Sequence, residues 1–204
     1  MSFQEYLARQ FGHPTGLGGA LVTAVMNRQN RPLYEAALRL LEADGSDSVL
    51  DVGCGNGFVL GLLGERTGAS LAGVDISGSM VRAAGRRNRR LVRGGRLTVK
   101  NGDAAHLPFP DGRFSKAYSI NTVYFWPDVD TAMAEVKRVL RPGGVFVNVL
   151  YSNDLLHAHP HTQTGGYRLR EPDALIGSSR NAGFDVDQVP LLGGTGYGLV
   201  CRAA

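Results

Sequence analysis

A short apolar run that leads directly into three closely spaced glycines constrains this sequence more than any other feature. Val49-Leu50-Asp51-Val52 precedes Gly53-Cys54-Gly55-Asn56-Gly57, and a helical pattern follows the last glycine. A glycine-rich turn between a strand and a helix lets the backbone approach a ligand closely and presents free helix N–H groups. The segment therefore predicts a strand-turn-helix unit with a ligand site at its turn.

Short apolar runs alternate with helical stretches from Ser48 onward, which is typical of a parallel sheet built from βαβ units. Strands are expected near residues 48–52, 70–74, 97–101, 115–120, 145–150, 184–189 and 197–202. Helices are expected near residues 57–65, 78–89, 130–140 and 172–182. The last two strands are joined by a connection short enough for an antiparallel hairpin. The pattern predicts an α/β fold: a Rossmann-like, doubly wound, seven-stranded, mostly parallel sheet with an antiparallel terminal strand.

The region before this alternation predicts helices and one loop. Ser2 and Glu5 form a capping-box pattern for a first short helix. The glycine-rich residues 12–19 indicate an ordered flap, and a second helix is expected through Leu21 to Met26. Asn30 is the expected N-cap of a third helix, which has an apolar stripe ending before Asp44.

The length of 204 residues predicts one domain. Its expected parts are N-terminal helices and flap (1–45), a ligand-binding core (46–150), a candidate substrate lid (151–166), and a C-terminal helix with hairpin (167–204). Two cysteines exclude a disulfide framework and a cysteine-based zinc site. The sequence has no apolar run of membrane-spanning length and no charged-then-apolar leader. We therefore expect a cytoplasmic protein without a membrane partner.

The net charge of +4 conceals one strongly basic segment. Eight basic residues lie together without an acid among them: Arg82, Arg86, Arg87, Arg89, Arg90, Arg93, Arg96 and Lys100. Such a run can hold phosphates, or it can be a solvated helix face. Because no aromatic side chains are interleaved for base stacking, the composition disfavours a nucleic-acid partner.

Acidic residues follow or precede the glycine turn where a nucleoside ligand would need them. The glycine spacing departs from the G-x-G-x-x-G of dinucleotide sites, and Asp51 would repel a pyrophosphate but suits an ammonium group. Asp75, at the end of the second strand, can accept hydrogen bonds from ribose hydroxyls. Asp103, after the third strand, can accept from an exocyclic amine. Together these positions describe a nucleoside whose tail carries an ammonium and a carboxylate.

Four motifs in series resemble the class I S-adenosylmethionine-dependent methyltransferases, specifically their small single-domain members. They are VLDVGCGNG (49–57), GVDIS (73–77), GDAAHLPFPDGRF (102–114) and VLRPGG (139–144). The resemblance implies S-adenosyl-L-methionine as cofactor. It places Gly53, Cys54 and Gly55 along the methionine part, with Asp51 toward the amino group and Asn121 near the tail and the reacting centre.

The same resemblance assigns the adenosine half of the cofactor. Asp75 and Ile76 would hold the ribose and one adenine face, while Asp103 and Ala104 would address the adenine edge. Each position also has a structural reading, since glycine turns recur in doubly wound folds and Asp103 can cap a helix. The positions support one another because ligands of such sheets bind at the carboxyl ends of successive strands.

Methyl transfer is an in-line displacement at a carbon activated by a positive sulfur, so the protein chiefly positions the acceptor and needs no metal. Tyr124 is the candidate to face the acceptor among the aromatics 124–126, whose alternative role is core packing. His157 is the candidate base among three lid histidines, which can also bind a metal or simply face solvent. His13 in the flap is more consistent with a structural role.

Three functions remain open from the sequence. The favoured one is methyl transfer to a small-molecule acceptor, with secondary metabolism as one setting, because little sequence lies outside the cofactor core. A nucleic-acid methyltransferase has only the basic run in its favour, and Asn121-Thr122-Val123-Tyr124 lacks the prolines of base-methylating relatives. A cofactor-binding protein without transferase activity would retain the same cofactor residues.

Overall fold

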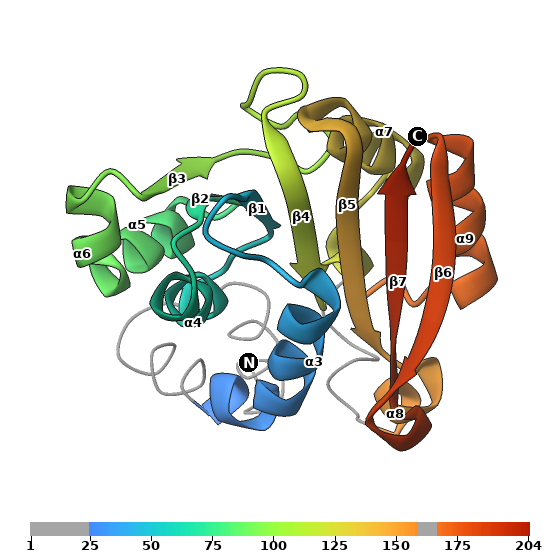
Figure 1. Cartoon of the computed structure of the whole chain (residues 1–204). Coiled ribbons are helices and arrows are strands. Elements are labelled where there is room, and N and C mark those ends of the chain that lie inside the picture. The colour runs from blue at the N-terminus through green and yellow to red at the C-terminus, as the bar shows by residue number, and fades with distance from the viewer. Residues whose placement is uncertain (1–24, 159–166) are drawn as a thin grey trace.

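The computed structural model describes residues 25–158 and 167–204. Within these ranges the strands form one seven-stranded sheet in the order β3-β2-β1-β4-β5-β7-β6 (Figure 1). Their bounds are β1 Ser48–Val52, β2 Ser70–Asp75, β3 Leu97–Asn101, β4 Phe114–Ile120, β5 Leu140–Tyr151, β6 Phe184–Leu191 and β7 Gly196–Ala203. β7 runs antiparallel to both of its neighbours, and the pairings among β1 to β5 are parallel. The predicted fold class and the terminal hairpin are confirmed.

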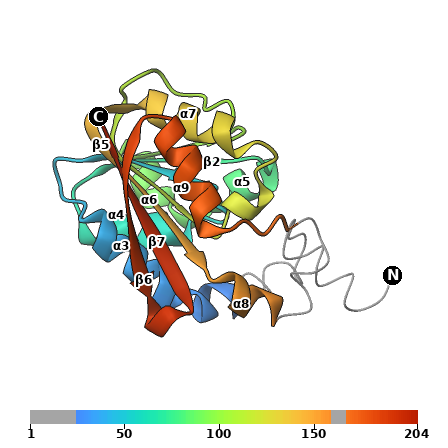
Figure 2. The ribbon, with the colours of Figure 1, turned by 90° about the vertical axis from the view of Figure 1, so that its right-hand side faces the viewer.

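The helices of the described ranges cover both faces of this sheet (Figure 2). They are α3 Arg31–Leu41, α4 Phe58–Arg66, α5 Gly78–Arg87, α6 Arg89–Arg93, α7 Val129–Val139, α8 Asn153–His157 and α9 Pro172–Asn181, with 3-10 turns at Val123–Phe125 and Leu192–Gly194. None of them combines the length and apolarity that a bilayer crossing requires. Of the predicted second helix, only Val25 and Met26 lie in the described part, where residues 25–29 are helical. The first helix and the flap at 12–19 lie outside it.

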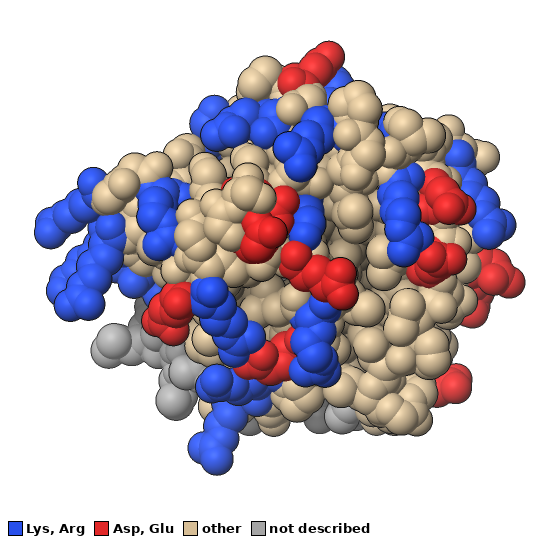
Figure 3. All heavy atoms as spheres, viewed as in Figure 1, with Lys and Arg blue, Asp and Glu red and all other residues tan. Residues whose placement is uncertain are grey.

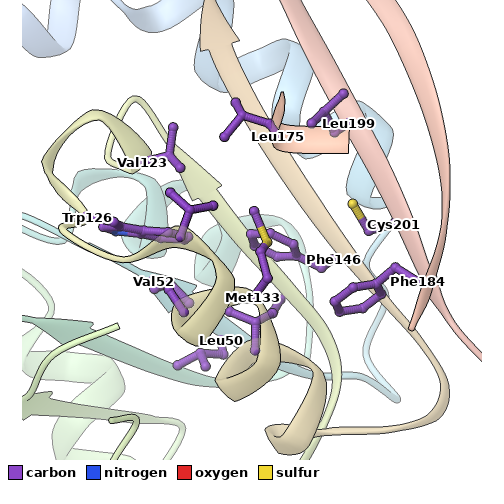
Figure 4. Close-up of a cluster of buried hydrophobic side chains, with 14 of the residues drawn as sticks. Leu50, Val52, Val123, Trp126, Met133, Phe146, Leu175, Phe184, Leu199 and Cys201 are labelled. Atoms are coloured by element: carbon purple, nitrogen blue, oxygen red, sulfur yellow. The ribbon is translucent and has the colours of Figure 1, made fainter. Parts of the chain in front are cut away.

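Each face of the sheet has its own buried cluster. On one face α3 and α4 pack apolar side chains such as Leu33, Leu41 and Leu60 against the strands. On the other, α7 and α9 pack against the strands through side chains that include Met133 and Phe146 (Figure 4). The two clusters bury the middle of the sheet between helices. The carboxyl ends of the parallel strands carry the candidate ligand-binding residues.

Three local predictions differ from the structure. The helix expected over 78–89 is interrupted at Asn88, whose buried side-chain amide donates to the carbonyl oxygens of Gly57 (2.8 Å) and Ala84 (3.1 Å). Asn30 stands at the N-cap position of α3, but its side chain makes no capping hydrogen bond. The strand expected from 145 begins at Leu140, because its pairing with β4 continues across a register shift between Phe114 and Lys116.

Candidate active site

The glycine turn follows β1 and is tied to the neighbouring strand β2. The amides of Gly53 and Cys54 both donate to the Val74 carbonyl, at 2.8 and 2.9 Å. Gly53 has a φ of 82°, and a Cβ placed on it would lie 2.6 Å from Cγ2 of Thr122. Glycine is therefore required at this position both by the left-handed backbone and by the close approach of Thr122.

Asp75, the last residue of β2, joins the second strand to the turn. Its Oδ2 accepts from the Gly55 amide at 2.8 Å, and its Oδ1 accepts from the Ser77 amide at 2.8 Å. Both carboxylate oxygens are thus held in place by backbone amides. The geometry fixes a carboxylate beside the glycine turn, at the carboxyl end of β2.

Asp51 is buried in β1 directly before the turn. Burial raises its pKa to about 8, the nearby Asp75 charge adds to the rise, and the adjacent Tyr118 hydroxyl offsets part of it. The Tyr118 hydroxyl is itself buried without a hydrogen bond of normal geometry. A cation placed next to Asp51 would favour the ionised form, so this carboxyl suits a positively charged ligand group.

Cys54, in the same turn, is buried, and burial raises the pKa of its thiol well above the usual range. A thiol held neutral is a poor nucleophile. Cys54 is therefore an unreactive small side chain within the turn, and its place along the methionine part of a cofactor stays a prediction.

The residues expected to meet an adenosine group lie beside Asp75. Ile76 is 68% exposed, which is unusual for a large apolar side chain. The Asp103 carboxylate accepts from the Ala105 amide at 3.0 Å, in the turn after β3. Asn101 was not singled out from the sequence, yet its side-chain amide donates to the carbonyls of Asp75 and Ile76, both at 2.9 Å. Ala104 packs against the core cluster of the α7 face.

Asn121 follows β4 and links it to β5. Its φ of 56° places it in the left-handed region, its amide donates to Val149 O at 2.9 Å, and its Oδ1 accepts from the Tyr151 amide at 3.3 Å. Next to it, the Thr122 hydroxyl donates to Val52 O at 3.3 Å. The ends of β1, β4 and β5 are thus held together at the same edge as Asp51 and Asp75.

The aromatic residues after β4 separate into buried and exposed side chains. Tyr124 is only 1% exposed, and its hydroxyl donates to Tyr151 O at 3.1 Å. Burial raises the pKa of Tyr124 above its usual range, so it is held as a neutral donor. Phe125 is 39% exposed and contacts Tyr167, with ring centroids 4.7 Å apart. These contacts give Tyr124 the packing role that the sequence left open, and its catalytic role stays a prediction.

His157 is the exposed last residue of α8, a helix that the sequence did not predict. It lies six residues beyond Tyr151 in the expected lid, of which residues 159–166 are outside the described part. His13, His159 and His161 are outside it as well. In the ranges that the structure describes, no three His, Cys, Asp or Glu side chains gather in a metal-binding arrangement. A role for His157 as base stays a prediction.

A second wall of the site comes from the start of α3, which the sequence did not connect to it. The Tyr151 hydroxyl donates to Asn30 Oδ1 at 3.0 Å, across 121 positions of the chain. Burial raises the pKa of Tyr34 to about 12. A hydrogen bond with Asn30 lowers this pKa, whereas the charges of Tyr151 and Asp51 raise it further. Tyr34, Tyr151 and Asp51 are therefore near neighbours. No local motif signals this convergence, because it depends on how α3 packs on the sheet.

The basic segment forms a separate surface over α5 and α6 (Figure 3). Six of its arginines are exposed: Arg82, Arg86, Arg87, Arg89, Arg90 and Arg93. Ion pairs in the described ranges involve other basic residues, such as Arg66, Arg138 and Arg202. Arg96 instead donates to the carbonyls of Gly64 and Thr67 and stabilises the turn before β2.

Known proteins resemble this chain in sequence. A family profile described as a methyltransferase domain matches residues 50–148. Methyltransferase GfsG of Streptomyces halstedii is 37% identical over 117 residues, which cover 57% of this chain and 41% of that protein. O-methyltransferase cnsE of Penicillium expansum is 36% identical over 131 residues, which cover 64% of this chain and 46% of that protein. The chain thus spans less than half the length of these relatives.

A solved structure also resembles the chain in fold. A SAM-dependent methyltransferase from Aquifex aeolicus superposes with a TM-score of 0.72 at 19% identity, covering 86% of this chain and 93% of that one. At that identity the likeness concerns the fold, a seven-stranded sheet of the order described above. The residues that the family profile matches include the glycine turn and the ends of β2 to β4.

Proposed function

This chain belongs to the class I S-adenosylmethionine-dependent methyltransferases, and we propose that it binds S-adenosylmethionine and transfers its methyl group to a small-molecule acceptor. The observation that carries the proposal is the hydrogen bond from the Gly55 amide to Asp75 Oδ2, 2.8 Å long. It fixes a carboxylate for ribose hydroxyls next to a turn whose backbone is open to close approach.

The residues present fit the whole cofactor. Asp75 would accept from the ribose hydroxyls, and the exposed Ile76 side chain would cover one adenine face. Asp103 and Ala104 would meet the adenine edge. Such an arrangement explains why an isoleucine is left 68% exposed at the end of a buried strand.

The methionine half would lie over the turn and the end of β4. Gly53, Cys54 and Gly55 would line it, and Asp51 would face its ammonium group. A buried carboxyl whose pKa stands at about 8 gains most from a neighbouring cation, since the cation restores the ionised form. Asn121, held by the strand ends of β4 and β5, would contact the tail next to the reacting centre.

The bound cofactor supplies a methyl carbon on a positively charged sulfur, so the protein's contribution is to place the acceptor in line with the carbon–sulfur bond. Tyr151, which Asn121 and Asn30 hold through its amide and hydroxyl, stands at the carboxyl end of β5 beside this region. Holding two reactants in line replaces an encounter in solution, and this can lower the barrier by about 7–11 kcal/mol. Positioning is therefore the main task of the side chains around Tyr151.

A small-molecule acceptor is supported by the kind of relatives that match. A fatty-acid O-methyltransferase of Mycolicibacterium smegmatis and a 24-methylenesterol C-methyltransferase of Oryza sativa are similar to this chain, at 33% and 30% identity, and their names give small-molecule acceptors. In this chain the exposed Phe125, in contact with Tyr167, offers an apolar surface after β4, and His157 offers an imidazole after β5. We propose His157 as the base for an acceptor that must lose a proton, and Tyr124 as the aromatic residue of the catalytic site that helps to position the acceptor.

Calorimetric titration tests the cofactor proposal directly. S-adenosylmethionine and S-adenosylhomocysteine should bind in the micromolar range, and NAD should not. Binding of NAD alone would contradict the assignment. Transferase activity is tested separately, by following S-adenosylhomocysteine release against a panel of hydroxyl, amine and carboxyl acceptors. Cofactor binding without release for any acceptor would favour a binding protein without catalysis.

A nucleic-acid acceptor is the second candidate, because six exposed arginines on α5 and α6 lack ion pairs within the described ranges. These helices follow β2 and flank β3, on the adenosine side of the proposed site and away from Tyr151. The arrangement favours the small-molecule acceptor. Methyl transfer to RNA or DNA that falls steeply with added salt would reverse this preference.

A further inference from the structure

A polar hollow lies at the β5–β7–β6 end of the sheet, away from the glycine turn. Its volume is about 290 Å³, and its walls come from the starts of α8 and α9 and from the connection between β6 and β7. Both views place α8 and that connection at the same end of the molecule (Figures 1 and 2). Its lining includes two carboxylates, Asp154 and Glu171, but no lysine or arginine.

Asn153, one of the residues that line this hollow, carries an unsatisfied acceptor. Its Nδ2 donates to Arg170 O at 3.2 Å and to Glu171 Oε1 at 3.1 Å. A carbonyl oxygen can only accept, so the NH2 group must face Arg170 and the amide cannot be turned over. Asn153 Oδ1 is consequently left buried without a hydrogen-bond partner.

Tyr197 supplies a second unsatisfied group. It lines the hollow, its side chain is only 5% exposed, and its hydroxyl has no hydrogen-bond partner. Burial raises its pKa to about 12, and the Glu171 charge adds to the rise, so the hydroxyl lies within the field of that carboxylate. A buried hydroxyl and a buried amide oxygen without partners each carry a desolvation cost that a ligand would remove.

We infer that this hollow binds a small organic cation with N–H donors, of the primary-amine or amino-alcohol class. The ammonium would donate to Asn153 Oδ1 and to the Glu171 carboxylate, whose position Asn153 already fixes, and a hydroxyl on the ligand would pair with Tyr197. The walls offer acceptors and negative charge, and a ligand of this class has both the N–H donors and the positive charge that complement them. The inference concerns a site apart from the cofactor residues and does not depend on methyl transfer.

Ethanolamine is the probe for this site, since it carries one ammonium and one hydroxyl. Titrated into the 204-residue chain and followed by amide NMR, it should shift the signals of Gly194, Gly196, Tyr197 and the Asn153 side chain and saturate in the millimolar range. Ethylene glycol, which has the same size without the charge, should leave them unchanged. Sodium chloride at equal ionic strength corrects for screening.

Substitutions then identify the groups that bind. Glu171→Gln keeps an oxygen for Asn153 but removes the charge, and should weaken ethanolamine binding about three- to fivefold. Tyr197→Phe should weaken it about two- to tenfold through the lost hydrogen bond. Asp173→Asn is the matched control, because Asp173 is an exposed acid in the first turn of the same helix and does not line the hollow. This control should bind as the unsubstituted protein does.

Three outcomes would overturn the inference. One is the absence of saturating shifts up to about 50 mM ethanolamine, which would leave water as the occupant. Another is an equal response to ethylene glycol. The third is an equal loss of affinity in Asp173→Asn and Glu171→Gln, which would indicate diffuse electrostatics. Matching amide spectra of the free variants establish that they fold.

Discussion

The hydroxyl of Tyr151 donates to Asn30 Oδ1 at 3.0 Å and so joins the start of α3 to the end of β5. Because the two residues are 121 positions apart, this bond forms only when α3 packs on the sheet. It stands at the strand edge where Asn121 also holds the Tyr151 amide. The packing of α3 and the position of Tyr151 are therefore coupled.

Removing that hydroxyl should have a measurable cost. Tyr151→Phe is expected to lower the free energy of unfolding by about 0.5–1.5 kcal/mol, the usual value of one partly buried hydrogen bond. Asn30→Ala should cost a similar amount, and the double variant little more than either one, since both changes delete the same bond. Urea unfolding of the four proteins measures this coupling, and strictly additive losses would show that the residues act independently.

Gly53 should tolerate no side chain. In Gly53→Ala the new Cβ would approach Thr122 Cγ2 to 2.6 Å while the backbone stays at a φ of 82°. We expect a loss of about 2–4 kcal/mol in unfolding free energy, from the left-handed conformation and the overpacking together. Thermal denaturation measures the effect.

Gly85→Ala is the control for that substitution, because Gly85 lies within α5 and a Cβ there would meet nothing within 4 Å. Alanine should stabilise this helix by up to about 1 kcal/mol. Equal destabilisation by both substitutions would contradict the argument. Thr122→Ser, which removes Cγ2, should recover part of the stability lost in Gly53→Ala.

The features that the sequence predicted are those that depend on local patterns. The apolar runs located the seven strands, and the positions of Asp75 and Asp103 at strand ends follow from the parallel topology alone. The break of the helix at Asn88 was not predictable, since it depends on the carbonyl of Gly57, which lies 31 residues earlier and reaches Asn88 only in the folded chain. The prediction that Asn30 caps α3 was wrong for the same reason, because its side chain accepts a hydrogen bond from Tyr151 rather than from the backbone of its own helix.

Aromatic residues show the other limit of local patterns. Sequence alone left Tyr124 between facing the acceptor and packing the core, and its neighbours in the chain do not decide between them. In the structure, the 3-10 turn after β4 directs Tyr124 inward onto the Tyr151 carbonyl and leaves Phe125 exposed. The sense of such a turn is set by tertiary contacts.

Asp75 should dominate the affinity for the adenosine half of the cofactor. Asp75→Ala removes the carboxylate proposed for the ribose and also the partner of the Gly55 amide, so binding of S-adenosylmethionine should weaken by about 1–3 kcal/mol. Isothermal titration measures this change. Asp185→Asn, on the edge strand β6 at the far end of the sheet, is an exposed control that should leave affinity unchanged. Unchanged affinity in Asp75→Ala would refute the ribose role.

Asp51 predicts how cofactor affinity depends on pH. In the free protein burial holds its pKa at about 8, and a bound ammonium group would lower that pKa, so binding should release a proton below this pH. Affinity should rise with pH by up to about tenfold per unit between roughly pH 6 and 7.5, a window below the ordinary pKa of an α-amino group.

The raised pKa of Asp51 also means that the free protein loses stability as pH rises from the unfolded value of 3.8 toward about 8, because the folded state holds the proton more tightly. Asp51→Asn should flatten both profiles, and titrations in two buffers of different ionisation enthalpy count the protons released. An affinity that is independent of pH in the unsubstituted protein would place the ammonium group elsewhere.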